Sequence, residues 1–182
     1  MRGDHTGEPH QEDQIHEIKN TVEMTLQLRY IKDVICNPYI GFVVPLNMCD
    51  RFGVSLMDML SIAEKQIPDF TQCNANLLAR NHGVYHITMF NVMEMKLKAV
   101  TGIKIDESIR YGSHMFEYKG IGCITKGDMS TYYVVVDSDE MNIERNIVGL
   151  PSRDLHITIG FTHKDLFTER KNVANFYAIP QK

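Results

Sequence analysis

The stretches YHITMF at residues 85–90 and LHITIGF at residues 155–161 decide how this chain folds. Each one places a histidine and a threonine two residues apart within an apolar run. Side chains in a β-strand alternate between its two faces, so the histidine and threonine of each triplet share one face, and the isoleucine between them points to the other. Each stretch therefore predicts a half-buried strand that presents an imidazole beside a hydroxyl. The four polar residues are His86, Thr88, His156 and Thr158.

Two such triplets are more than chance provides. A shuffled chain of 182 residues with 8 histidines would hold about 0.5 His-x-Thr triplets, and about 0.04 with an apolar residue before, between and after. Taken singly, each triplet also fits a strand whose histidine is merely hydrogen-bonded. The pair favours a shared pocket with two imidazoles and two hydroxyls, which suits phosphate-ester chemistry.

Bulk composition limits the class of protein. An apolar share of 43% and a charged share of 23% are ordinary for a globular chain. The net charge of −4 argues against a broad surface for duplex DNA and leaves a nucleotide or short RNA as partner. The 4 cysteines are scattered, and the sequence shows neither a signal peptide nor an apolar run of membrane-spanning length. We therefore expect a cytoplasmic monomer with reduced thiols and no membrane partner.

Hydrophobic periodicity and turn residues divide the first half of the chain into segments. Residues 1–12 lack periodicity and are expected to form a flexible tail. Apolar residues spaced by three and four predict an amphipathic helix over 13–32. The β-branched and aromatic run at 39–46 predicts a strand, and 54–66 predicts a helix with Ser55 as its cap.

The rest of the chain follows a similar pattern. Residues 69–83 are interpreted as a loop with a short helix, before the first His-Thr strand over 84–92. Residues 93–115 are ambiguous, with helix and turn signals mixed. Strands are predicted over 115–125, 131–137 and 154–161. A helix is predicted between the last two strands, with Ser138 as its cap and residue 146 as its end.

Each half thus repeats the order strand, helix, loop and His-Thr strand. The simplest architecture that brings the two histidines together is an α+β fold of two lobes. We expect pseudo-duplicated antiparallel sheets with flanking helices and a central cleft. The lobes would span about 39–100 and 115–165 within a single domain over 13–182.

Paired His-Ile-Thr strands in a chain of this length resemble the two-histidine (2H), or LigT-like, phosphoesterase superfamily, over about residues 39–165. Relatives include enzymes that act on 2′,3′-cyclic phosphate RNA ends, tRNA-splicing and RNA-repair phosphodiesterases, and viral or phage enzymes that destroy cyclic or 2′-5′-linked oligonucleotide signals. The paired motif does not choose among these subgroups. The resemblance implies that the catalytic residues are His86, Thr88, His156 and Thr158.

The residue types suggest how such a site works. Histidine titrates near neutrality and can act as base or acid, so one imidazole would take a proton from water or a ribose 2′-hydroxyl and the other would protonate the leaving oxygen. The threonines would donate hydrogen bonds to the phosphoryl oxygens. The sequence leaves open which histidine is the base. It contains no H-E-x-x-H or Cys/His zinc pattern, so we predict neither a metal nor another cofactor.

Further candidates are weaker on sequence alone. Tyr39, Phe42 and Tyr132 could stack on a base, although aromatic residues in strands more often belong to the core. Lys126 could contact phosphate from a turn, and Asp154 could orient the histidine that follows it. We expect the three aromatic residues and Lys126 to bind substrate.

Three functions fit these observations. The first is a metal-independent phosphodiesterase that cleaves cyclic or 2′-5′/3′-5′ oligonucleotide signals, with RNA-end processing of 2′,3′-cyclic phosphates as its alternative. The second is a catalytically silent module that binds nucleotide or RNA. The third is a structural domain with coincidental motifs. The presence of both histidines and both threonines favours the enzyme.

Overall fold

The computed structural model describes residues 26–33, 35–97 and 114–178. Its centre is a seven-stranded antiparallel sheet with the strand order β1-β2-β3-β6-β5-β4-β7. The strands are β1 (Gln27–Lys32), β2 (Pro38–Val44), β3 (Tyr85–Phe90), β4 (Glu117–Lys126), β5 (Met129–Asp137), β6 (Leu155–Phe161) and β7 (Phe176–Ala178). The helices are α1 (Leu56–Gln66), α2 (Phe70–Arg80) and α5 (Asp139–Ile147), with short 3₁₀ turns η1 (Glu94–Lys96) and η2 (Val173–Asn175).

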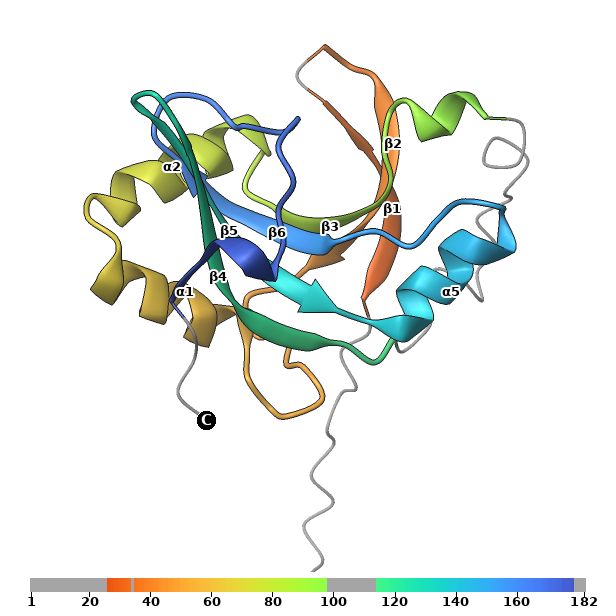
Figure 1. Ribbon diagram of the computed structural model, residues 1–182, viewed down its shortest axis with the longest axis horizontal. Coiled ribbons are helices and arrows are strands. Elements are labelled where there is room, and N and C mark those ends of the chain that lie inside the picture. Colours follow the sequence, from red (N-terminus) through yellow and green to blue (C-terminus); the bar gives the residue numbers. More distant parts are fainter. Residues whose placement is uncertain (1–25, 34, 98–113, 179–182) are drawn as a thin grey trace, which may run out of the picture.

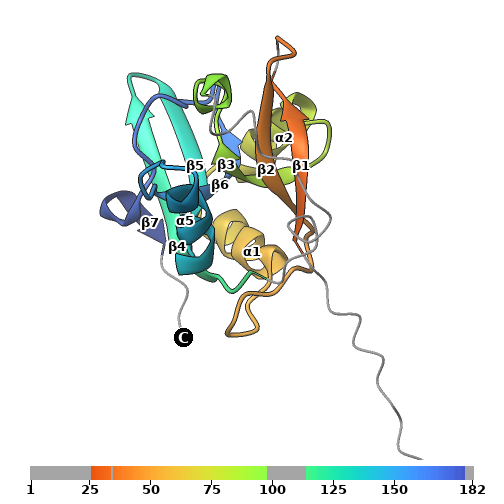
Figure 2. The same cartoon turned by 90° about the vertical axis from the view of Figure 1, so that its right-hand side faces the viewer.

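The two His-Thr strands lie side by side in the middle of the sheet. Strands β3 and β6 pair antiparallel, with Ile87 opposite Ile157. Each is flanked on its outer side by the preceding strand of the chain, β2 beside β3 and β5 beside β6. Figure 1 shows β3 and β6 crossing the molecule between β1/β2 and β4/β5, and Figure 2 shows the same arrangement from the side. The two predicted lobes are therefore halves of one continuous sheet.

One face of the sheet is covered by α1 and α2. Their apolar residues join a core with the central isoleucines, Ile87 and Ile157, which are fully buried. At Gly160 an added Cβ would lie 3.0 Å from the backbone of Cys73 in α2, so glycine lets this helix approach β6 closely. Burial of these side chains on one face leaves the alternate residues of β3 and β6 on the other face.

Helix α5 covers one end of the central strands. Ser138 caps it by accepting a hydrogen bond from the Met141 backbone, as its sequence predicts. Arg145 is 1% exposed, and its guanidinium donates to the backbone carbonyls of Met89 and Pro151. A buried arginine of this kind requires full hydrogen bonding, and here it ties α5 to the end of β3.

Two predicted segments differ from the structure. Residues 27–32, expected to be helical, form the edge strand β1 because they pair with β2 and bury Leu28. Leu26 is buried and not helical, and residues 13–25 of that prediction, with the predicted tail, lie outside the described residues. Residues 69–83, expected to be a loop with a short helix, contain the 11-residue helix α2, whose apolar side chains Phe70, Cys73 and Leu77 pack on the core.

The remaining predicted elements are confirmed within a few residues. Ser55 caps α1 with a reciprocal capping box to Asp58. The architecture is α+β with an antiparallel sheet and flanking helices, as predicted. Within the part of the chain that the structure describes, none of the helices is long and apolar enough to cross a membrane.

Candidate active site

The register of the central strands brings the four polar residues of the motifs together. Because Ile87 lies opposite Ile157 in an antiparallel pair, His86 faces Thr158 and Thr88 faces His156. All four side chains are half-buried and leave the sheet on the face opposite the isoleucines. The two histidines are diagonal neighbours, which typically lie roughly 7–8 Å apart. A phosphoryl group fits between two imidazoles at such a separation.

His156 is held from its Nδ1 side. Its Nδ1–H donates to the backbone carbonyl of Asp154 at 3.2 Å. In a neutral ring this leaves Nε2 as a hydrogen-bond acceptor. The ring of Tyr133 from β5 packs edge-on against the imidazole, with 6.0 Å between the centroids. His156 is therefore oriented as a proton acceptor.

His86 is held from the other nitrogen. Its Nε2 lies 3.1 Å from the hydroxyl of Tyr39 in β2, and the two ring centroids are 5.4 Å apart. Its Nδ1 is buried without a hydrogen-bond partner among the described residues. Burial raises the pKa of Tyr39 to about 12, so this phenol keeps its proton. The two histidines thus have different surroundings despite their matching motifs.

Burial also keeps both imidazoles neutral. It lowers the pKa of His86 to about 4, with Arg80 adding to the effect, and the pKa of His156 to about 3, with Lys171 adding to the effect. Desolvation disfavours the charged form of a histidine, and nearby cations disfavour it further. A bound phosphate anion would act in the opposite direction and raise the pKa of the imidazole that it contacts.

A buried ion cluster lies against the second threonine. Lys171 is 4% exposed, and its Nζ is 2.9 Å from Asp165 and 3.5 Å from the hydroxyl of Thr158. Arg80 pairs with the same aspartate at 2.8 Å. Two cations therefore share one carboxylate, and the cluster has a net positive charge beside the polar face of the sheet.

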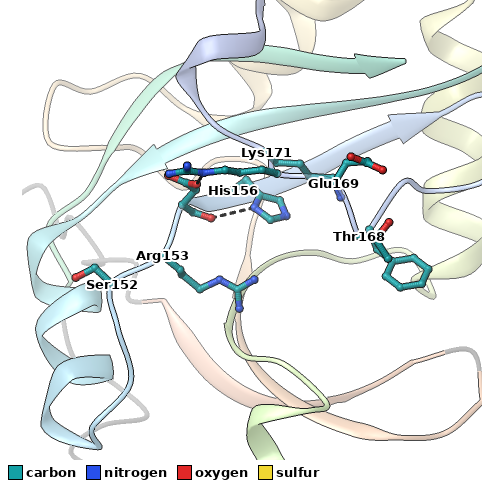
Figure 3. Close-up of a pocket in the computed structure, with 9 residues that line it drawn as sticks. Ser152, Arg153, His156, Thr168, Glu169 and Lys171 are labelled. Carbon is teal, nitrogen blue, oxygen red and sulfur yellow. Dashed lines mark hydrogen bonds and ion pairs between the residues drawn. The ribbon is translucent and has the colours of Figure 1, made fainter. Parts of the chain in front are cut away.

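A cavity of about 620 Å³ opens next to His156. This volume is within the usual range for small-molecule sites. Figure 3 shows the Arg153 side chain near the His156 ring, and Lys171 lines the same cavity. His86 is not among the lining residues, which are Ser152, Arg153, Asp154, His156, Phe167, Thr168, Glu169, Arg170 and Lys171.

The structure separates the four residues expected to bind substrate. Tyr39 lies on the polar face beside His86. Phe42 and Tyr132 belong to the core on the opposite face, at 0% and 9% exposure, where a base cannot reach them; the core packing corrects the prediction for these two. Lys126 is exposed at the end of β4, 3.5 Å from Glu169, and does not line the cavity.

Asp154 orients His156 through its backbone carbonyl and not through its carboxylate. The carboxylate pairs with Arg170, while the backbone carbonyl accepts the imidazole proton. Sequence reasoning also missed three cations, Arg80, Arg153 and Lys171. Lone basic residues in loops and at helix ends have no pattern that would reveal them, because their meeting depends on strand order. Within residues 26–33, 35–97 and 114–178, no group of three His, Cys, Asp or Glu residues could hold a metal ion.

Comparison with known proteins gives one result. No curated protein and no solved structure matches the chain. A family model described as the Swiss Army Knife, 2H phosphoesterase domain (2H-SAK) matches residues 56–167, a span that contains both His-Thr strands and more than half of the chain. Arg170 and Lys171 lie just beyond it. The protein therefore belongs to the 2H phosphoesterase family, which implies hydrolysis of phosphoric diesters in general.

Proposed function

We propose that this protein is a metal-independent phosphodiesterase that cleaves cyclic or 2′-5′/3′-5′-linked oligonucleotides by two-histidine acid–base catalysis. His86 and His156 exchange protons with the attacking and leaving oxygens, and Thr88 and Thr158 donate hydrogen bonds to the phosphoryl oxygens. The observation that carries this proposal is the β3–β6 register, which gives all four side chains one face of the sheet.

The two imidazoles divide the proton transfers. The hydrogen bond from Nδ1 of His156 to a carbonyl leaves Nε2 free to take a proton from water or a 2′-hydroxyl. His86 then protonates the leaving oxygen, with the Tyr39 hydroxyl beside its Nε2. Burial keeps both rings neutral, and the substrate anion itself raises the pKa of the imidazole that must act as the acid. The roles reverse in the reverse reaction.

Lys171 supports the phosphoryl group electrostatically. Its ammonium lies 3.5 Å from the Thr158 hydroxyl, so both can approach the same non-bridging oxygen. Its partner Asp165 is shared with Arg80, which leaves positive charge available to an anion. A preorganised cation in a site that excludes much of the water stabilises charge that shifts onto those oxygens.

The test is turnover in EDTA on a panel of 2′,3′-cyclic nucleotides, 2′-5′ oligoadenylates and cyclic dinucleotides. We expect wild type to cleave at least one of them. His86→Ala and His156→Ala should each lower kcat by about 10²–10⁴-fold, the usual contribution of a general acid or base. His163→Ala, which removes an exposed histidine, serves as the matched control and should retain activity.

Two outcomes would redirect the proposal. Cleavage confined to 2′,3′-cyclic nucleotides would favour RNA-end processing over the destruction of oligonucleotide signals. If wild type and both histidine variants are equally inert across the panel, the enzyme proposal fails, and a silent module that binds nucleotide takes its place.

A further inference from the structure

A second ion cluster, formed by Glu94, Arg145 and Arg153, reaches the cavity through Arg153. The carboxylate of Glu94 accepts hydrogen bonds from Arg145 at 2.8 Å and 3.2 Å, and it lies 3.6 Å from Nη1 of Arg153. Here again two cations share one anion. Two ion clusters, each with one positive charge in excess, thus reach the cavity beside His156, one through Lys171 and the other through Arg153.

The two arginines of this cluster are not equivalent. Arg145 is fully buried, and its guanidinium is engaged by Glu94 and by two backbone carbonyls. Arg153 keeps 25% of its side chain exposed and lines the cavity. Its Nη1 is buried without a hydrogen-bond partner among the described residues, since the ion pair with Glu94 is too long for one. The unmatched charge is therefore that of Arg153.

The backbone of Arg153 is fixed by α5. The side chain of Asn142 accepts a hydrogen bond from the Arg153 N–H at 2.9 Å and donates to its carbonyl at 3.5 Å. This double contact sets where the arginine leaves the chain, three residues before His156. A guanidinium that is held at the wall of a cavity, with a quarter of its side chain exposed and no hydrogen bond to the carboxylate beside it, is suited to bind a phosphate oxygen.

The other charged residues of the cavity wall are already paired. Asp154 is neutralised by Arg170, and Glu169 lies near Lys126. Lys171 lies against Thr158, where the scissile phosphate is expected. Among the described residues of the cavity, these pairings leave Arg153 to bind an anion other than the scissile phosphate.

We propose that Arg153 forms a subsite for a second phosphate of the substrate, next to the scissile one on the His156 side. This inference rests on the proposed function and narrows its substrate class. The preferred substrates are nucleotides with at least two phosphates, such as dinucleotides or short oligonucleotides, and cyclic mononucleotides with a single phosphate are poor ones. A cavity of about 620 Å³ is large enough to hold more than one phosphate group.

The test is calorimetric titration with adenosine 3′,5′-bisphosphate, 3′-AMP and 5′-AMP. Wild type should bind the bisphosphate about 10-fold or more tightly than either monophosphate, as expected for one added charge-assisted contact. Arg153→Gln should lower bisphosphate affinity to the monophosphate level and leave monophosphate binding unchanged, which also shows that the variant is folded. Arg51→Gln removes one arginine from a pair with Glu117 outside the cavity and should behave like wild type.

The outcomes separate this inference from the proposed function. Equal affinities for the three nucleotides, or an Arg153→Gln variant that weakens all three alike, would overturn the subsite. If the protein also cleaves members of the EDTA panel, the proposed function stands without it. Bisphosphate selectivity that depends on Arg153, in a protein that cleaves nothing, would support the subsite and overturn the enzyme.

Discussion

Tyr39 gives His86 its one polar contact in the described structure. The imidazole Nδ1 is buried without a partner, so the 3.1 Å contact at Nε2 fixes the ring rotation. With a pKa near 12, the phenol remains an O–H that can donate to this nitrogen or accept its proton. Tyr39 is therefore a positioning residue for His86, a different role from the stacking expected from sequence.

Tyr39→Phe tests this role. Removing the hydroxyl keeps the ring packing but frees the imidazole to rotate, so kcat should fall about 10-fold with little change in KM, the cost of one hydrogen bond made to the reacting group. Steady-state kinetics on the best panel substrate measures the split. Tyr118→Phe removes a similar hydroxyl, bonded to the Met48 carbonyl away from the site, and should leave kcat unchanged. Equal kinetics for Tyr39→Phe and wild type would contradict the assignment.

At the scale of elements, the spacing between β2 and β3 depends on a glycine. A Cβ added to Gly41 would lie 2.6 Å from the backbone carbonyl of Ile87 and 3.1 Å from Ile31. The first contact involves backbone, which cannot move aside as a side chain tip can. Gly41 therefore lets β2 approach the His-Thr strand closely enough for Tyr39 to reach His86.

Gly41→Ala should consequently lower both stability and activity. We expect the free energy of unfolding to fall by about 1–3 kcal/mol, the usual cost of overpacking, because β2 must shift away from β3. Urea denaturation measures the loss, and kcat should fall as Tyr39 moves. Gly53→Ala is the comparison: its loop position has open space but a φ of +80°, so backbone strain should lower stability and leave kcat intact. An active, stable Gly41→Ala protein would rule out the spacing argument.

Local patterns were sufficient to predict most elements. Alternating apolar residues and capping residues predicted β3, β6, α1 and α5, because these signals act within a few residues of chain. The length of helix α2 was underestimated because its N-cap residue, Asp69, has a left-handed backbone conformation and makes no side-chain cap hydrogen bond. Strand β1 was predicted as a helix because its neighbour in the sheet, β2, decides its conformation.

At the scale of the whole molecule, the sequence could predict the motif residues of the site but not the charges around them. A period of two within one strand suffices to put His and Thr on one face. By contrast, Arg80, Arg153 and Lys171 come from separate segments and meet only because of strand order and the path of the chain after β6. The burial of Phe42 is likewise a property of the packed sheet.

The half-buried histidines, with cations beside them, also affect global stability. An unfolded histidine has a pKa near 6.5, whereas in the folded protein the pKa of His86 is about 4 and that of His156 is about 3. At a pH between the unfolded and the folded pKa values, these histidines bind protons in the unfolded chain but not in the folded one. The contribution of these two histidines to the free energy of unfolding is therefore fully present above pH 6.5, and it decreases as the pH falls toward the folded pKa values.

The free energy of unfolding should accordingly drop between pH 7 and pH 5, by up to about 2 kcal/mol for each histidine. Carboxylates contribute little in this window because their unfolded pKa values lie near 4. Urea denaturation at both pH values measures the drop. His156→Asn should reduce it by one histidine's share, whereas His163→Asn, an exposed position, should leave it unchanged. An identical drop in wild type and His156→Asn would mean that His156 already takes up its proton in the folded protein, and the neutral-base assignment would then be wrong.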